Sequence, residues 1–316
     1  MILAVSTSKN LPPPAGGYRG RFAPSPTGPL HAGSLVAALG SWLDARKNEG
    51  EWLLRIEDLD SPRNVPGAAE LIQSQLLACG LVWDEGPVYQ SERTELYQAA
   101  LERLNGLKCL YPCTCSRQTI AKTLSGLGIE TPRNQEIVYP GTCRPETLFS
   151  YTNQDLSHSN SAWRIALPQN TRIDFDDLSL GNQSQDLNQQ VGDFVLRRGD
   201  GIFTYQLAVV VDDALQGITH IVRGEDLLGN TARQLYLQNI LGYHRPSYRH
   251  LPLVLDEHGE KLSKQTLATQ IQTQDSNNAL TELRRAALHL GISNLPDSKS
   301  TTITEWLIAA THAWKS

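Results

Sequence analysis

The feature of this sequence that most restricts its fold is a strand, a tight turn and a helix that follow one another near the start. The segment reads Arg21-Phe-Ala-Pro-Ser-Pro-Thr-Gly-Pro-Leu-His-Ala-Gly-Ser34, and apolar residues then recur at helical spacing from Leu35 to Leu43. Such a unit directs backbone N–H groups and the positive end of a helix dipole at the turn. His31 lies at that turn, where its ring could donate to a phosphate. The segment therefore predicts an anion site between a strand and a helix.

Strand-like and helix-like segments alternate along much of the remaining chain. The patterns predict strands over Trp52–Ile56 and Ile218–Val222, and helices over Pro66–Leu81, Thr94–Leu107 and Thr231–Leu241. A hairpin turn is predicted at Arg198-Gly-Asp-Gly201, between the runs Phe194–Arg197 and Ile202–Thr204. Alternation of this kind favours an α/β fold in which crossover helices connect a parallel sheet.

One stretch breaks this alternation. Residues 108–190 are rich in Ser, Asn and Gln, and we interpret them as an insertion that splits one domain into residues 20–107 and 191–265. Residues 1–19 contain a Pro/Gly patch and are expected to be a flexible lead-in. The segment 266–316 is expected to be helical, since Asn278–Leu290 and Thr302–Trp314 show helical apolar spacing.

Composition narrows the class of protein. A formal net charge of −5 disfavours a protein that holds nucleic acid by bulk positive charge. No segment approaches the roughly 20 consecutive apolar residues that a membrane helix needs. Five cysteines, three of them clustered, fit a reduced compartment and a metal site better than disulfides. We therefore expect a cytoplasmic protein, monomeric and without a membrane segment.

A second motif, Lys261-Leu-Ser-Lys-Gln265, places two lysines in a polar loop that could follow the negative charge of a leaving pyrophosphate. The pair of motifs resembles the class I aminoacyl-tRNA synthetases, with His31-Ala-Gly-Ser34 in the place of the HIGH motif and Lys261–Gln265 in that of KMSKS. The flanking segments resemble the glutamyl branch of that family, from about Gly20 to Gln265. They are Arg21–Gly28, Leu54-Arg-Ile-Glu-Asp-Leu-Asp60 and Ile221-Val-Arg-Gly-Glu-Asp-Leu-Leu228.

The resemblance implies a Rossmann-like class I synthetase catalytic domain with a zinc-containing insertion and a short helical C-terminal tail. It implies that Mg²⁺-bound ATP activates L-glutamate to glutamyl-adenylate, and that His31 and Lys264 act on the phosphates. The ATP-binding residues it implies are His31, Gly33, Ser34, Lys261 and Lys264.

Length separates two members of the glutamyl branch. A glutamyl-tRNA synthetase continues into a large anticodon-binding domain, whereas only residues 266–316 follow the second motif here. We therefore expect the truncated paralogue, which transfers glutamate to the queuosine base at the wobble position of tRNA(Asp). A truncated glutamyl-tRNA synthetase that charges a tRNA 3′ end, and an inactive tRNA-binding paralogue, remain the alternatives.

The amino-acid pocket can be argued from the groups that glutamate presents. Its ammonium requires a carboxylate, and its two carboxylates suit guanidinium forks and hydroxyl donors. Glu57 and Arg223 each follow or end a predicted strand, where ligands of parallel sheets collect. The family's glutamate-binding positions match Arg21, Phe22, Ala23, Pro24, Ser25, Glu57, Tyr205 and Arg223.

The metal candidate lies in the expected insertion. Cys113-Thr-Cys115 and Cys143 offer three thiolates, and a structural zinc site needs four ligands. The resemblance implies Tyr139, four residues before Cys143, as the fourth ligand, with His158 or a water as the alternatives. Cys79 and Cys109 are expected to be non-ligands.

Overall fold

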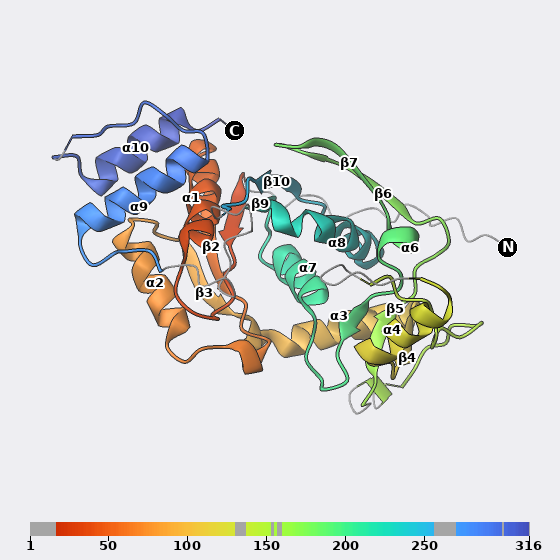
Figure 1. The fold of residues 1–316 in the computed structure, drawn as a ribbon. Coiled ribbons are helices and arrows are strands. Elements are labelled where there is room, and N and C mark those ends of the chain that lie inside the picture. The colour runs from red at the N-terminus through yellow and green to blue at the C-terminus, as the bar shows by residue number, and fades with distance from the viewer. Residues whose placement is uncertain are drawn as a thin grey trace.

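The computed structural model describes residues 17–129, 137–152, 155–156, 160–255, 270–298 and 300–315. The helices are α1 (Ala32–Lys47), α2 (Ala68–Ala78), α3 (Thr94–Gly106), α4 (Arg117–Gly126), α6 (Leu187–Gln190), α7 (Tyr205–Leu215), α8 (Leu228–Leu241), α9 (Ser276–His289) and α10 (Ile303–Ala313). The strands are β1 (Arg19–Phe22), β2 (Glu51–Ile56), β3 (Glu85–Tyr89), β4 (Leu110–Cys113), β5 (Ala162–Ile165), β6 (Arg172–Asp177), β7 (Gly181–Asp186), β8 (Val195–Arg197), β9 (His220–Gly224) and β10 (Ser247–Leu251). In Figure 1, α9 and α10 lie at one end of the molecule, and β4, β5 and α4 lie at the other. None of the helices in the described ranges combines the length and apolarity needed to cross a membrane.

Parallel strands form the centre of the fold. Strand β1 pairs with β2, and β2 with β3, all in parallel. Strand β9 pairs in parallel with β10, which pairs in turn with β6. The two groups meet at Arg19 and Thr219, where the Thr219 N–H donates to the Arg19 carbonyl over 2.9 Å. The strand order therefore runs outward in both directions from β1 and β9, as in a doubly wound sheet whose ligand crevice lies at the switch point. The expected Rossmann-like α/β fold is confirmed.

Helix α1 covers the switch point, and its buried position explains why its sequence is apolar on most sides. Leu35, Leu39 and Leu43 are all fully buried or nearly so, and they share one hydrophobic cluster with Trp52 of β2. Helices α9 and α10 complete this cluster through residues such as Leu283 and Trp306. The two helices predicted near the end of the sequence are therefore confirmed, and they pack directly on the sheet-covering helix.

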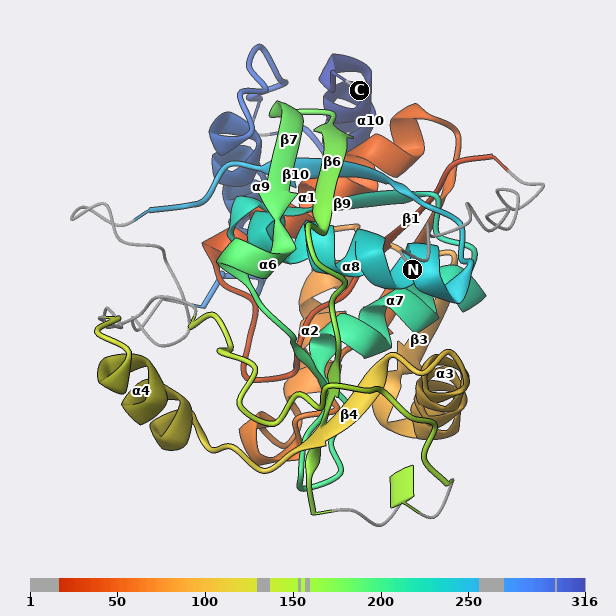
Figure 2. The same cartoon turned by 90° about the vertical axis from the view of Figure 1, so that its right-hand side faces the viewer.

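The segment expected to be an insertion is divided between two sheets. Strands β4 and β5 of this segment form an antiparallel sheet beside α4, together with β8, which follows the segment in the chain. Strand β6, in contrast, joins β10 of the main sheet. Figure 2 shows the β6–β7 hairpin lying along the main body, away from α4. Phe175 of β6 packs against Tyr248 and Leu235, which ties this hairpin to the main core. This attachment cannot be recognised from the sequence, because residues 172–186 are mostly polar and most of their other side chains face solvent.

The folded body also begins earlier than expected. Tyr18 and Arg19 fall within the predicted lead-in, yet Tyr18 is buried and its hydroxyl donates to Asp44 of α1 over 2.6 Å. The Tyr18 ring stacks on His220 at a centroid distance of 4.1 Å. These contacts correct the predicted boundary: Tyr18 belongs to the main core, and Arg19 is the first residue of β1.

Candidate active site

A cavity of about 860 Å³ lies where β1, β2 and β9 end and α1 begins. It is lined by every described residue that the sequence analysis assigned to glutamate or ATP, namely Arg21, Phe22, Ala23, Pro24, Ser25, His31, Gly33, Ser34, Glu57, Tyr205 and Arg223. Lys261 and Lys264 lie outside the described residues, so their assignment stays a prediction. The structure therefore brings together groups from four separate segments of the chain at the carboxyl ends of parallel strands.

Arg223 is a buried cation with neutral partners. Its guanidinium donates to Nε2 of His250 (3.1 Å), the Tyr205 hydroxyl (3.3 Å), Oε1 of Gln234 (2.8 Å), Oγ1 of Thr231 (2.8 Å) and the Leu227 carbonyl (3.2 Å). No carboxylate among the described residues forms an ion pair with it. A buried charge without a counter-ion is costly. Arg223 is therefore prepared to bind an anion in the cavity.

Two residues behind Arg223 hold it in place. Nδ1 of His250 donates to Oδ2 of Asp177 over 2.6 Å, so Nε2 of the same ring is free of a proton and accepts from Arg223. Burial lowers the pKa of His250, which agrees with a neutral ring. The sequence analysis did not identify Asp177 or His250, because each lies in a strand with other polar residues and no local motif distinguishes it from them.

Glu57 supplies the opposite charge. It follows β2, and its backbone N–H donates to the Pro24 carbonyl over 2.9 Å, which joins it to the first motif. Its carboxylate is 8% exposed, and Oε1 has no hydrogen-bond partner although Nη2 of Arg55 lies 3.5 Å away. Burial raises the pKa of Glu57 to about 7 against the opposing charges of Arg55 and Arg21. An ammonium group in the cavity would stabilise the charge of this carboxylate.

Arg21 differs from Arg223 because a carboxylate already balances it. Its Nε donates to Oδ1 of Asp213 over 3.2 Å, and the same oxygen accepts from Nη2 of Arg55 over 2.8 Å. Burial would raise the pKa of Asp213, but the charges of Arg55 and Arg21 outweigh it and lower the pKa. Of Arg21 and Arg223, the latter is therefore the one without a carboxylate partner among the described residues.

His31 caps the N-terminus of α1. Its Nδ1 accepts from the Ser34 N–H over 3.3 Å, so a neutral ring carries its proton on Nε2. Gly33 and Ser34 lie in the first helical turn, where backbone N–H groups have no partner within the helix and the dipole favours negative charge. This end of the cavity suits a chain of phosphates.

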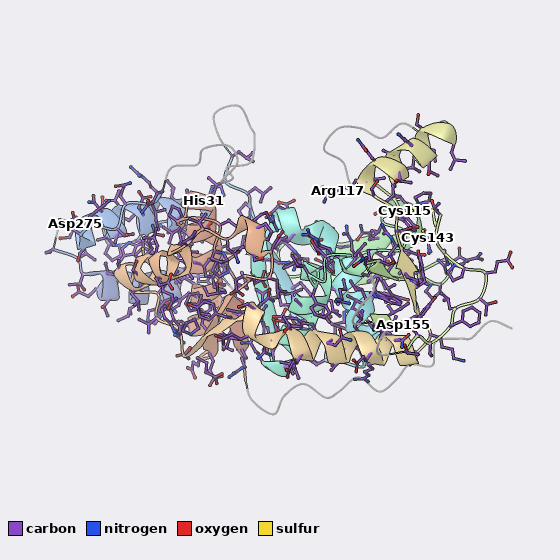
Figure 3. All side chains as sticks on the ribbon, turned by 90° about the horizontal axis from the view of Figure 1, so that it is seen from below. His31, Cys115, Arg117, Cys143, Asp155 and Asp275 are labelled. Carbon is purple, nitrogen blue, oxygen red and sulfur yellow. The ribbon has the colours of Figure 1, made fainter. Side chains whose placement is uncertain are left out.

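A second site lies in the insertion, where Cys113, Cys115 and Cys143 place their sulfur atoms within 4.8 Å of one another. Figure 3 shows Cys115 and Cys143 side by side, far from His31. The Tyr139 hydroxyl lies 3.4 Å from Sγ of Cys113 and 3.8 Å from Sγ of Cys115. Three sulfurs and one phenol oxygen thus converge as four candidate ligands, the number that a tetrahedral structural zinc requires.

The remaining cysteines and the alternative ligand can be placed as follows. Cys109 donates from Sγ to the Leu104 carbonyl over 3.1 Å, and Cys79 is fully buried in the main core. Neither belongs to the group of three converging thiols. His158 lies outside the described residues.

The comparisons with known proteins agree with this architecture. Residues 18–305 match the model of the family described as "tRNA synthetases class I (E and Q), catalytic domain". The chain therefore belongs to the class I aminoacyl-tRNA synthetases, and it is a ligase.

The chain is 52% identical to the glutamyl-Q tRNA(Asp) synthetase of Burkholderia cenocepacia, over 94% of this chain and 96% of the relative. A relative of the same name from Albidiferax ferrireducens is 51% identical over 92% of this chain and 98% of its own length. Within its class, the chain belongs to the glutamyl-Q tRNA(Asp) synthetases.

Solved structures show the same fold. The chain resembles a glutamate tRNA ligase from Elizabethkingia meningosepticum, in complex with its amino acid, with a TM-score of 0.67 and 32% identity. The match covers 78% of this chain and 52% of the solved one, so the present chain spans about half of that enzyme's length. A glutamate-tRNA synthetase from Elizabethkingia anophelis gives the same TM-score at 33% identity, over 79% of this chain and 53% of the solved one.

Proposed function

We propose that this protein uses ATP to activate L-glutamate and then transfers the glutamyl group to the queuosine base at the wobble position of tRNA(Asp). The observation that carries the first half is the pairing of charges in the cavity. Glu57 offers a buried carboxylate whose Oε1 has no hydrogen-bond partner, and Arg223 offers a buried guanidinium without a carboxylate partner among the described residues. A ligand with both an ammonium and carboxylates satisfies the two together. The names of the full-length relatives support the second half.

The arrangement assigns a role to each group that binds glutamate. Glu57 accepts from the ammonium, and Arg223 with Tyr205 donates to one carboxylate. Arg21 and Ser25, which lie at the end of β1 and just beyond it, complete the proposed set. Bidentate pairing of a guanidinium with a carboxylate provides both energy and orientation. The pocket therefore holds the reacting carboxylate in a defined position relative to the phosphate end of the cavity.

Activation needs positioning more than acid–base chemistry. The glutamate carboxylate attacks the α-phosphate, an acyl–oxygen–phosphorus link forms, and the bond to the departing pyrophosphate breaks. His31, Gly33 and Ser34 line the phosphate end, and Lys261 and Lys264 are proposed to neutralise the leaving group. Mg²⁺ accompanies the ATP and supplies further neutralising charge when bound.

The converging thiols of Cys113, Cys115 and Cys143, with the Tyr139 hydroxyl, are proposed to hold one structural zinc ion. The ligand types and their number suit zinc. Bound metal would join β4 to the loop that contains Cys143, and it would thereby brace the insertion beside the cavity. We further propose that the insertion contributes to acceptor recognition, and that the protein acts as a monomer in the cytoplasm.

The test uses the full chain with ATP, labelled glutamate and two preparations of tRNA(Asp), one with queuosine and one with the unmodified base. Label should enter only the tRNA that carries queuosine, and removal of the 3′-terminal adenosine should leave the labelling unchanged. Labelling that requires this adenosine would identify a truncated glutamyl-tRNA synthetase instead. Absence of both labelling and ATP–pyrophosphate exchange would identify a non-catalytic paralogue.

A further inference from the structure

Two adjacent carboxylates lie in the last turn of α7, which occupies the middle of the molecule (Figure 1). They belong to Asp212 and Asp213, and their side chains are almost completely buried. The C-terminal end of a helix disfavours negative charge, and a buried charge is costly without partners. The groups around these two carboxylates must therefore offset the cost of placing them there.

The two carboxylates face different neighbours. Oδ1 of Asp212 accepts from Nε of Arg93 over 2.7 Å. Its Oδ2 accepts from Nε2 of Gln90 over 2.7 Å and from the Tyr97 hydroxyl over 2.8 Å. Both oxygens of Asp212 are thus used to attach α7 to residues 90–97. Asp213 is turned instead toward the strands that end at the glutamate cavity.

Asp213 is shared by two arginines. Its Oδ1 accepts from Nη2 of Arg55 over 2.8 Å and from Nε of Arg21 over 3.2 Å. Arg55 is fully buried, whereas Arg21 lines the cavity. The bond to Nε leaves Nη1 and Nη2 of Arg21 for a carboxylate in the cavity. One carboxylate therefore balances two neighbouring guanidinium groups and orients the one that meets the substrate.

Arg55 also lies beside Glu57. Oε1 of Glu57 is completely covered and lies 3.5 Å from Nη2 of Arg55, so a ligand in the cavity can reach this carboxylate only through Oε2. Among the described residues, Asp213 is the carboxylate that hydrogen-bonds to Arg55, because Gln216 is neutral and Asp212 lies 3.8 Å away. Without the charge of Asp213, the buried guanidinium would draw Glu57 away from the cavity.

We infer that Asp213 is a positioning residue for glutamate activation, which orients Arg21 and, by pairing with Arg55, leaves Glu57 available to the substrate ammonium. This inference rests on the proposed function, because Arg21 and Glu57 are the groups proposed to bind glutamate. Desolvation of a buried ion pair costs about as much as its attraction returns, so the pairing itself adds little stability. Its effect is on the geometry and charge of the pocket.

The test is ATP–pyrophosphate exchange by the full chain without tRNA, measured as kcat/KM for glutamate between about pH 5.5 and 9. This ratio follows ionisation in the free enzyme. The charged or titratable groups that face Glu57 come from β1, β2 and α7, and they are Arg21, Arg55, Asp212, Asp213 and Tyr205. Burial raises the pKa of Glu57 to about 7, the two arginines lower it, and the two aspartates raise it. The profile should therefore rise with a midpoint at about pH 7.

Asp213→Asn removes the charge and keeps an oxygen that can accept from both arginines. We expect KM for glutamate to rise by about ten-fold or more, with a smaller change in kcat, because binding is affected first. The midpoint should move to lower pH, since a negative charge near Glu57 has been removed. The matched control is Glu51→Gln at the start of β2, whose side chain is 53% exposed and pairs with Arg19; KM and midpoint should both stay at their wild-type values.

Gln216→Glu makes the reverse change at a half-buried position. Oε1 of Gln216 accepts from Nη1 of Arg55 over 2.6 Å, so the new carboxylate would contact the same guanidinium. The added negative charge should move the midpoint to higher pH. Displacements of opposite sign in the two variants distinguish control of the pocket's charge from a general loss of structure, which has no reason to reverse its sign.

Each outcome decides the inference. Opposite displacements of the midpoint, with a raised KM in Asp213→Asn, support it. An unchanged midpoint in either folded variant overturns it, and so does a wild-type KM in Asp213→Asn. If Asp213→Asn does not fold, the midpoint of Gln216→Glu decides alone. A wild-type protein that shows no glutamate-dependent exchange would refute the proposed function itself, independently of these variants.

Discussion

Arg223 donates through Nε to Nε2 of His250 over 3.1 Å, and His250 is in turn fixed by Asp177 on the far side of its ring. These contacts place a neutral acceptor behind a guanidinium that has no carboxylate partner among the described residues. The guanidinium is thereby oriented while its charge remains available to a substrate carboxylate. Asp177 and His250 are positioning residues, because they act on the substrate only through Arg223.

The first prediction tests this arrangement with Asp177→Asn. An asparagine amide can donate to Nδ1 of His250, which would move the ring proton to Nε2, opposite the Nε–H of Arg223. We expect the KM for glutamate in ATP–pyrophosphate exchange to rise by about ten-fold, with a smaller change in kcat, because binding geometry is affected first. Asp174→Asn is the matched control on the same strand, since its side chain is 71% exposed. Equal KM values for Asp177→Asn and wild type would contradict the role of His250.

The second prediction concerns pH. Burial raises the pKa of Glu57 to about 7, above its ordinary value of 4.5. The ammonium of glutamate requires the ionised carboxylate, so KM for glutamate should fall as pH rises from 6 through about 7 to 8. Glu57→Gln should bind glutamate weakly and show no such dependence. A wild-type KM that stays constant over this range would exclude a titrating Glu57.

The same pKa predicts an effect on stability in the absence of ligands. The native state retains the Glu57 proton between pH 4.5 and about 7, whereas the unfolded state has released it. The stabilising contribution of this group is therefore present below pH 4.5 and is lost as pH rises through about 7. Denaturant unfolding at several pH values should show that Glu57→Gln lacks this loss.

The third prediction separates two roles of His31. As the N-cap of α1 it accepts from Ser34, and its Nε2–H is the proposed donor to phosphate. His31→Asn preserves capping and removes the ring donor, so stability should remain near wild type while exchange falls by about 10²-fold. His31→Ala should show the same loss of exchange and should also lose about 1 kcal/mol of unfolding free energy. Normal exchange in His31→Asn would assign His31 to capping alone.

The fourth prediction is that one zinc ion is tightly bound per chain. Cys143→Ala should release it, because the three sulfurs lie within 4.8 Å of one another and each is needed for a closed site. Cys109→Ala should retain zinc, since this thiol hydrogen-bonds to Leu104 instead. Elemental analysis of the purified variants provides the measurement. Full zinc retention in Tyr139→Phe would assign the fourth position to His158 or a water.

The fifth prediction is selectivity for glutamate. Glutamine would replace a charge-assisted pair with Arg223 by a neutral contact, and aspartate is one methylene shorter, so its reacting carboxylate would be displaced from the α-phosphate. Exchange kinetics at saturating ATP should give kcat/KM at least about 100-fold higher for glutamate than for either analogue. Near-equal values for glutamate and glutamine would remove Arg223 from carboxylate recognition.

Local patterns were sufficient for some elements and insufficient for others. The strand, turn and helix from Arg21 to Leu43 could be predicted because neighbouring residues carry the signal, and the structure confirms β1 and α1 there. No helix was predicted over Tyr205–Leu215, where Val209, Val210 and Val211 form a β-branched run. The residues from Gln206 to Asp213 are all buried, so this helix lacks the exposed polar face by which an amphipathic helix is recognised in a sequence.

The sequence by itself determined the α/β class, the family, and the groups expected to meet glutamate and ATP, because these depend on short motifs whose residue types and order express their chemistry. Only the tertiary structure decided that Asp177 and His250 stand behind Arg223, that β6 joins the main sheet, and that Asp213 pairs with both Arg21 and Arg55. These features join residues far apart in the chain through packing and hydrogen bonds. The periodicity of a single sequence carries no information about such contacts. Charge balance around a buried group is likewise a property of its neighbours in space, which is why Arg21 and Arg223 look alike in sequence and differ in the fold.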